Sequence, residues 1–232
     1  MKKRTCAISL IRACCLSQYA YAAMVLVADT NNNRVLRYEV DGLNWTLGGT
    51  FASGTYAGAA IALPLGLAQD ASGTVYVGEQ RDGGRILKLD SDGNFSGILA
   101  TEGADFVGRP EALAIGPDGN LFMSVAFGTT SDRLYRIDPT NGSVQTLVAS
   151  GLNNPRGIAF DADGTLYVAD RDNNRIAKYD AESGSSKGTL ASVTRPQGLL
   201  FDQSVNGIIA TVYTKPSILG YTLGGTSTTL YQ

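Results

Sequence analysis

The chain has 232 residues, of which 44% are hydrophobic and 17% charged, and its formal net charge is −2. These values fit a soluble globular protein, and the lack of a dense run of Lys and Arg argues against nucleic acid as a main partner. Histidine does not occur in the sequence, so a Ser-His-Asp triad and histidine metal sites are excluded.

The first 22 residues are predicted to form a signal peptide. Met1–Arg4 is basic, a mostly small and apolar stretch follows, and Ala20–Ala22 offers a cleavage site. A disordered start is the alternative. If cleavage occurs, the mature protein (23–232) is secreted or periplasmic and has no cysteine, because all three cysteines lie in the first 15 residues. No other apolar run approaches the roughly 20 residues of a membrane span.

After this segment the sequence repeats itself. Tripeptides of the type Pro-x-Gly or Pro-x-Ala begin at Pro64, Pro110, Pro155 and Pro196. Each is followed by a tight-turn signal, a second apolar run, a third run that in most units starts with arginine, and a variable fourth run. The turn signals are Ser72-Gly73, Asp118-Gly119, Asp163-Gly164 and Asn206-Gly207.

Four short strands in about 40–45 residues is the period of a β-propeller blade. One such sheet cannot bury both faces alone, so it must stack on copies of itself. The sequence therefore predicts an all-β propeller of about five four-stranded blades. The first unit is expected to lack its opening strand, because the chain enters it at Val25. A five-bladed ring, an incomplete six-bladed ring and a fragment of a longer propeller all stay open.

Two segments carry a specific resemblance to a known family. Ala28–Val35 (ADTNNNRV) and Ala169–Ile176 (ADRDNNRI) resemble the signature of NHL repeats. The resemblance covers about 24–232 and extends to the wider senescence-marker-protein/gluconolactonase group of propellers. It implies a propeller fold. Some related propellers are lyases that depend on histidine. The resemblance does not imply that activity here, because this chain has no histidine.

The same resemblance implies where a divalent metal would lie. In gluconolactonase-like enzymes a Glu, an Asn and an Asp hold it, and the Asn and Asp directly precede the glycine of an inner strand. The matching residues here are Leu65, Glu111, Arg156 and Gln197. None is Asn or Asp, and Arg156 would place a cation where the metal should lie. We therefore expect no metal and no cofactor, with calcium as the alternative.

In a propeller, the loops that lead into the inner strands share one face with the loops between second and third strands. This channel-mouth face is the predicted site of ligand binding. Its candidate residues are Glu111, Arg156 and Gln197 from the first kind of loop, and Asp29, Glu79 and Asp170 from the second.

Each candidate also has a structural interpretation. Glu111 and Arg156 could pair only with each other, and the acids that end second strands could fix the following turn. The arginines that recur once per unit, Arg34, Arg85, Arg133 and Arg175, are interpreted as structural, bonding neighbouring backbone carbonyls. Tyr38, Tyr76, Tyr135, Tyr167 and Tyr179 are expected to pack between blades.

These observations predict a monomeric binding scaffold, with variable loops on a rigid framework, for a small molecule, a glycan or a protein. The alternative is a gluconolactonase-like hydrolase with Glu111 as its channel carboxylate. A fragment without function is the third reading.

Overall fold

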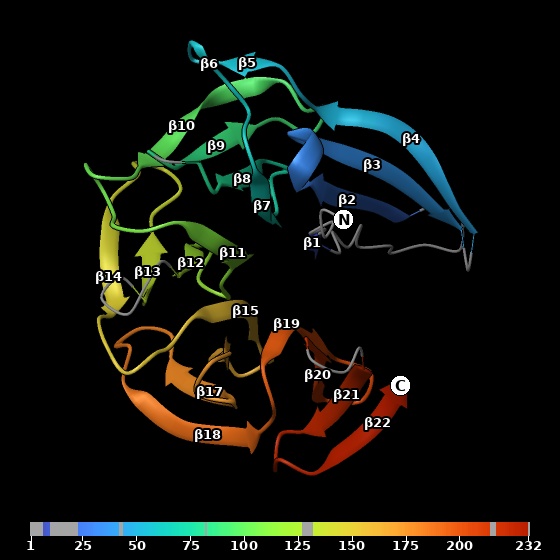
Figure 1. Cartoon of the computed structure of the whole chain (residues 1–232), viewed down its shortest axis with the longest axis vertical. Coiled ribbons are helices and arrows are strands. Elements are labelled where there is room, and N and C mark those ends of the chain that lie inside the picture. Colours follow the sequence, from blue (N-terminus) through green and yellow to red (C-terminus); the bar gives the residue numbers. More distant parts are fainter. Residues whose placement is uncertain are drawn as a thin grey trace. The chain divides into compact units, whose positions relative to one another are not determined.

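The computed structural model describes residues 7–9, 23–41, 44–81, 83–126, 132–213 and 217–231. The chain divides into two compact units, 1–104 and 105–232. Both consist of four-stranded antiparallel sheets in which consecutive strands pair (Figure 1). The predicted all-β fold with four-stranded blades is confirmed, and the residues that the structure describes form five such blades. Among the described residues, no helix is long and apolar enough to cross a membrane.

Unit 1–104 holds two blades. The first has strands β1 to β4, with bounds Ala7–Ser9, Ala23–Asp29, Arg34–Asp41 and Asn44–Ala52, and the 3-10 turn η1, Thr30–Asn32. The second has β7 to β10, with bounds Pro64–Gln69, Val75–Glu79, Arg85–Leu89 and Phe95–Thr101. A small hairpin of β5, Thr55–Tyr56, and β6, Ala59–Ala60, joins the two blades.

Unit 105–232 holds three blades. Blade three has β11 to β14, with bounds Pro110–Ile115, Leu121–Val125, Arg133–Ile137 and Val144–Val148. Blade four has β15 to β18, with bounds Pro155–Phe160, Thr165–Asp170, Arg175–Asp180 and Ser186–Ser192. Blade five has β19 to β22, with bounds Pro196–Asp202, Gly207–Val212, Ser217–Thr222 and Ser227–Tyr231.

The first blade differs from the sequence expectation. A short opening strand is present, because β1 pairs with β2 from Ala7 opposite Ala28 to Ser9 opposite Leu26. This strand lies inside the segment predicted to be a signal peptide. Most of that segment, including the three cysteines, lies outside the described residues. Its cleavage stays a prediction.

The core lies between neighbouring blades of each unit. In unit 1–104 it combines Leu26 and Val35 of the first blade with Val75 and Leu87 of the second. In unit 105–232 one cluster joins blades three and four, and another joins blades four and five. Fully burying a side chain of this size contributes about 1.5–3 kcal/mol. The predicted stacking of repeats therefore supplies the apolar partners that a single blade lacks.

The first strands of neighbouring blades pack closely, and this explains the glycine of the Pro-x-Gly motif in blade four. Strand β15 lies against β11 on one side and β19 on the other. A Cβ atom on Gly157 would stand 2.6 Å from the carbonyl oxygen of Gln197 and from the backbone nitrogen of Leu199. Both are main-chain atoms of β19, so a side chain has no room at this position.

A second repeated feature, a hydrogen bond from a backbone N–H to a side chain of the preceding blade, links neighbouring blades at their loops. The residues directly before Pro64, Pro155 and Pro196 have left-handed backbone conformations, with φ of 48°, 56° and 48°. Each donates its backbone N–H to a side-chain oxygen of the preceding blade. The three acceptors are Asn33 for Leu63 at 2.8 Å, Asp132 for Asn154 at 2.6 Å and Asn174 for Arg195 at 3.1 Å.

Candidate functional site

The loop leading into a blade's first strand lies beside the loop between its second and third strands, as the sequence predicted. Pro155 is paired with Asp170, and Pro196 with Val212. We define the top face as the edge of unit 105–232 where β11, β15 and β19 begin and where the β16–β17 turn lies. Most of the predicted site residues of this unit are on or beside this edge.

The acids that end second strands hold the framework together. Glu79 and Asp170 are fully buried. Glu79 forms an ion pair with Arg85, and Asp170 accepts from the Nε of Arg175 at 2.7 Å. Their second oxygens accept backbone N–H groups of the leading loops, from Ala62 at 2.7 Å and Asn153 at 2.8 Å. A third pair, Asp29 with Arg34 at 2.8 Å, is partly exposed.

The recurring arginines then reach the chain that precedes their blade. Arg85 donates to the carbonyl oxygens of Tyr56 at 2.9 Å and Ala59 at 3.0 Å, and Arg175 donates to that of Gly151 at 3.0 Å. This agrees with the structural interpretation of Arg85 and Arg175. In these contacts Asp29, Glu79 and Asp170 fix turns, and their predicted role in ligand binding stays a prediction.

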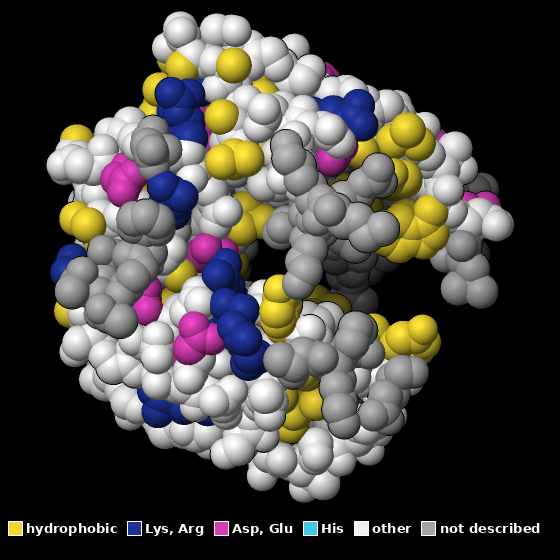
Figure 2. Space-filling model, viewed as in Figure 1, with side chains coloured by type: hydrophobic (Ala, Val, Ile, Leu, Met, Phe, Trp, Pro, Cys, Tyr) yellow, Lys and Arg dark blue, Asp and Glu magenta, His cyan; other side chains and the backbone are white. Residues whose placement is uncertain are grey.

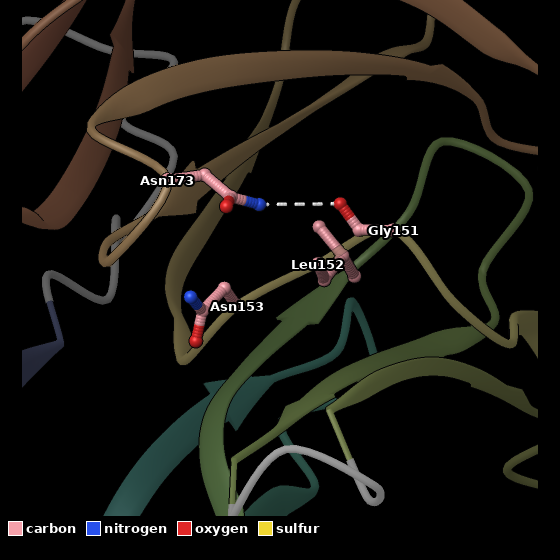
Figure 3. A pocket seen from close by; sticks show the side chains of 4 residues that line it. All are labelled: Gly151, Leu152, Asn153 and Asn173. Atoms are coloured by element: carbon pink, nitrogen blue, oxygen red, sulfur yellow. Dashed lines mark hydrogen bonds between the residues drawn. The ribbon is translucent and has the colours of Figure 1, made fainter.

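A small open pocket of 310 Å³ lies on this framework in blade four, lined by Gly151, Leu152, Asn153 and Asn173 (Figure 3). Asn173 points across it and donates from Nδ2 to the carbonyl oxygen of Gly151 at 3.2 Å. The same Nδ2 donates to Asp170 at 2.9 Å. The pocket therefore lies beside groups that are already hydrogen-bonded to one another within blade four.

Glu111 and Arg156 form an ion pair between neighbouring first strands. Glu111 lies on β11 with its side chain 6% exposed, and Arg156 lies on β15 with 26% exposed. The other two matching positions provide no metal-binding set. Leu65 is a buried apolar residue of β7, and Gln197 is a half-buried residue of β19. Among the described residues, no group of three or more Cys, Asp or Glu could hold a metal ion.

Arg156 belongs to a set of three arginines on the top face, which we call the arginine cluster. Arg171 lies in the β16–β17 turn and Arg195 directly before β19, so two blades supply the three side chains. Electrostatic coupling links Arg171 to both of the others. Figure 2 shows a continuous row of Lys and Arg side chains, flanked by Asp and Glu, over the region of β15.

Tyr213 and Asp172 hold two members of the cluster. The guanidinium carbon of Arg171 lies 4.9 Å from the centre of the Tyr213 ring, and that of Arg195 lies 5.4 Å from it. Both are within the range of cation–π attraction. Asp172 is 3.9 Å from Arg171 and 3.5 Å from Arg195, and it accepts a hydrogen bond from Asn154 at 2.8 Å.

Hydrogen bonds also fix the backbone at each arginine. The carbonyl oxygen of Arg156 accepts from the buried Ser124 hydroxyl at 2.7 Å. That of Arg171 accepts from the N–H of Asn174 at 3.1 Å, and that of Arg195 from the N–H of Tyr213 at 3.2 Å. The main chain thus presents the three side chains from fixed points.

The cluster is electrostatically unbalanced. Burial lowers the pKa of Arg171; the charge of Asp172 opposes this shift, and the smaller effects of the Arg156 and Arg195 charges add to it. The Nε atoms of all three arginines are buried and have no hydrogen-bond partner among the described residues. A buried polar group without a partner costs free energy. Three cations here face two carboxylates, Glu111 and Asp172.

The sequence predicted only part of this site. Glu111, Arg156 and Gln197 were selected because they stand in the middle of a Pro-x-Gly or Pro-x-Ala motif. Arg171, Arg195 and Tyr213 were missed. A usable signal did exist for the two arginines, since neither stands at the position where arginine recurs in four of the five units.

Comparison with known proteins identifies the repeat. The family model of the NHL repeat matches residues 152–179, which contain β15, β16 and all of β17 except its last residue, Asp180. The NHL-repeat-containing protein 4 of Mus musculus is 28% identical over 102 residues, covering 44% of this chain and 70% of the mouse protein.

Solved structures share the fold at low sequence identity. A gluconolactonase from Xanthomonas campestris is 20% identical, with a TM-score of 0.70 over 90% of this chain and 72% of its own. A chain of a nidogen/laminin complex is 19% identical, with a TM-score of 0.74 over 90% and 76%. A catalytically inactive virginiamycin B lyase from Staphylococcus aureus is 16% identical, with a TM-score of 0.66 over 91% and 68%. The match of one repeat to the NHL model and the mouse relative support an NHL-type repeat, and the solved structures show that the fold is a β-propeller with gluconolactonase-like structural neighbours.

Proposed function

We propose that this protein is an exported, non-catalytic scaffold that binds a small molecule, a glycan or a protein on the top face of unit 105–232. The observation that supports the proposal is the Glu111–Arg156 ion pair. It joins the one carboxylate that the hydrolase alternative would use to the guanidinium of the neighbouring blade. The surrounding polar groups lie on loops fixed by a packed framework, as is common for binding sites.

The donor set does not fit the divalent metal of the gluconolactonase-like enzymes. Hard cations need several oxygen ligands. Of the four matching positions, Leu65 and Arg156 offer no oxygen donor in their side chains, Gln197 offers one amide, and Glu111 already pairs with a cation.

Lactone turnover tests the choice between scaffold and hydrolase. The wild-type protein should hydrolyse glucono-1,5-lactone in calcium, zinc or manganese no faster than its Glu111→Ala variant does. Glu182→Ala, which removes an exposed carboxylate from the β17–β18 turn, is the matched control. Metal-dependent turnover that is present in the wild type and Glu182→Ala but lost in Glu111→Ala would refute the scaffold proposal.

Binding and export are tested separately. A thermal-shift screen with neutral and charged glycans and small molecules should yield a ligand whose binding Arg156→Met abolishes. Ligands that bind equally well to Arg156→Met would place the binding site elsewhere. For export, sequencing the N-terminus of protein recovered outside the cytoplasm should give Ala23, and an intact N-terminus would contradict the predicted cleavage.

A further inference from the structure

From the arginine cluster we infer that the top face binds a small organic molecule through a carboxylate or phosphate group. This inference rests on the proposed binding function and names its ligand class. It starts from a difference among the arginines of unit 105–232. Arg175 donates from Nε to a buried carboxylate, whereas the Nε atoms of Arg156, Arg171 and Arg195 have no partner among the described residues. The Nε of Arg133, at the start of β13, has none either, so what distinguishes the cluster is that its three arginines lie together on the top face around Asp172 and Tyr213.

The contacts within the cluster leave positive charge uncompensated. Asp172 serves both Arg171 and Arg195, at 3.9 Å and 3.5 Å, and it also accepts a hydrogen bond from Asn154. The 3.9 Å separation is too long for a hydrogen bond. Glu111 pairs with Arg156. These five side chains carry three positive and two negative charges, in a protein whose net charge is −2.

The exposed fraction of each arginine side chain determines how much of the cluster a ligand can contact. Arg171 is 11% exposed, Arg156 26% and Arg195 39%. Because the Nε atoms are buried, a ligand would have to bind through the terminal nitrogens of these guanidinium groups. Guanidinium groups donate well to carboxylate and phosphate oxygens, and these charge-assisted hydrogen bonds are the strong ones.

The site is organised before any ligand arrives. Arg195 keeps a left-handed backbone, with φ of 48°, that a non-glycine residue rarely adopts. Its N–H is held by Asn174 and its carbonyl by the N–H of Tyr213. The Tyr213 ring, 49% exposed, contacts two of the three guanidinium groups and offers a flat surface beside them. Such preorganisation reduces the entropy cost of binding.

Small anions with matched neutral partners test the inference. Glucuronate, glucose 6-phosphate and inorganic phosphate are titrated against the full chain by calorimetry at low ionic strength, with glucose as the neutral control. At least one anion should bind at a single site, and added salt should weaken it. The two sugar derivatives distinguish carboxylate from phosphate recognition, and inorganic phosphate shows whether the organic part contributes.

Single arginine variants locate the binding. Arg156→Met, Arg171→Met and Arg195→Met should each weaken the anion at least about tenfold, as expected when one charged partner of a buried contact is removed. Arg136→Met is the matched control, because Arg136 is 27% exposed, pairs with Asp118 in the same unit and lies outside the cluster. Arg171→Met should also melt no earlier than the wild type, because its guanidinium is buried and repelled by its neighbours.

Three outcomes would overturn the inference. One is the absence of anion binding up to about 10 mM, the range of a weak single-site ligand. Another is binding that Arg136→Met weakens as much as the cluster variants do. The third is an acidic peptide that binds when none of the small anions does. A neutral ligand that binds the top face would leave the scaffold proposal intact, whereas Glu111-dependent lactone turnover would refute the scaffold proposal itself.

Discussion

Two sets of arginines in this protein show how the same residue type serves two purposes. Arg85 and Arg175 recur at the start of third strands, and each Nε donates to a carboxylate five or six residues earlier in the chain. Arg133 stands at the same position of blade three, but its Nε has no partner among the described residues. Arg171 and Arg195 stand at positions where arginine does not recur. Their Nε atoms have no partner in the described part of the chain, and they share Asp172.

Within one repeat, an arginine whose Nε is hydrogen-bonded to a carboxylate can therefore lie close to an arginine whose Nε has no such partner. Arg171 and Arg175 lie four residues apart in the same hairpin of blade four. Arg175 completes a local network with Asp170 and Gly151, whereas Arg171 lies between like charges. We interpret the first set as the framework of the blades and the second as a site where a ligand supplies the missing anion. The predictions below test this separation.

The largest effect is expected from Glu79→Ala. This change would leave Arg85, with a side chain only 6% exposed, without its ion-pair partner. Removing one partner of a buried pair costs about 3–5 kcal/mol. Urea unfolding measures the loss of stability. Glu39→Ala, on an exposed position of the same unit, should change the free energy of unfolding little, and an equal loss in both variants would argue against a framework role.

Gly157→Ala should be the next most damaging change. The new methyl group would meet two main-chain atoms of β19 at 2.6 Å, and overpacking of this kind costs about 1–3 kcal/mol. Gly119→Ala is the control, because a Cβ there meets nothing within 4 Å and its cost comes only from the positive φ of 79°. Chemical unfolding should rank Gly157→Ala as the less stable variant, and the reverse order would contradict the close packing of β15 and β19.

Arg175→Met and Arg171→Met compare the two sets directly. Arg175→Met removes a charged hydrogen bond to the fully buried Asp170, so it should cost about 2 kcal/mol of stability. Arg171→Met should change the stability much less than Arg175→Met, because the burial of the Arg171 guanidinium and the repulsion from Arg156 and Arg195 offset its contacts with Asp172 and Tyr213. Thermal and urea unfolding decide the matter. The separation of the two sets would fail if Arg171→Met destabilised the protein as much as Arg175→Met.

Asn174→Ala and Asn33→Ala test the same kind of hydrogen bond in two different blades. Both asparagines have left-handed backbones, and each accepts the N–H of the next blade's leading residue. Both variants should lose about 1–2 kcal/mol, the cost of placing alanine in this conformation. Only Asn174→Ala should also weaken the anion, because only its partner, Arg195, belongs to the cluster. Equal anion affinity in the two variants would show that Asn174 does not position Arg195.

The smallest effect concerns acid stability at the β17–β18 turn. Hydrogen bonds from Ser183 and from Lys187 lower the pKa of Asp180 to about 2. Since the unfolded value is about 3.9, Asp180 stabilises the fold above about pH 4, and this contribution is lost as the pH falls through 2. Unfolding of Asp180→Asn at pH 6, 4 and 2.5 should show a shallower acid loss than the wild type. Parallel pH profiles would refute this prediction.

The sequence by itself determined the local part of this protein. The spacing of turns and apolar runs gives four-stranded blades, because strand pairing and tight turns depend on neighbours within about 15 residues. The acid at the end of a second strand and the arginine that starts the third are close in sequence, so their pairing follows from the hairpin. The pairing of Glu111 with Arg156 was also foreseen, since both stand in the same repeated motif.

Only the tertiary structure decided which charges stay unbalanced. Arg156, Arg171 and Arg195 are 15 and 24 residues apart in sequence and come from two blades, so stacking of blades brings them together. The left-handed backbone of Arg195 depends on Asn174 of the preceding blade. Whether an arginine has a hydrogen-bond or ion-pair partner therefore depends on how neighbouring blades stack. A sequence repeat predicts a contact between blades only where that contact is the same in every blade.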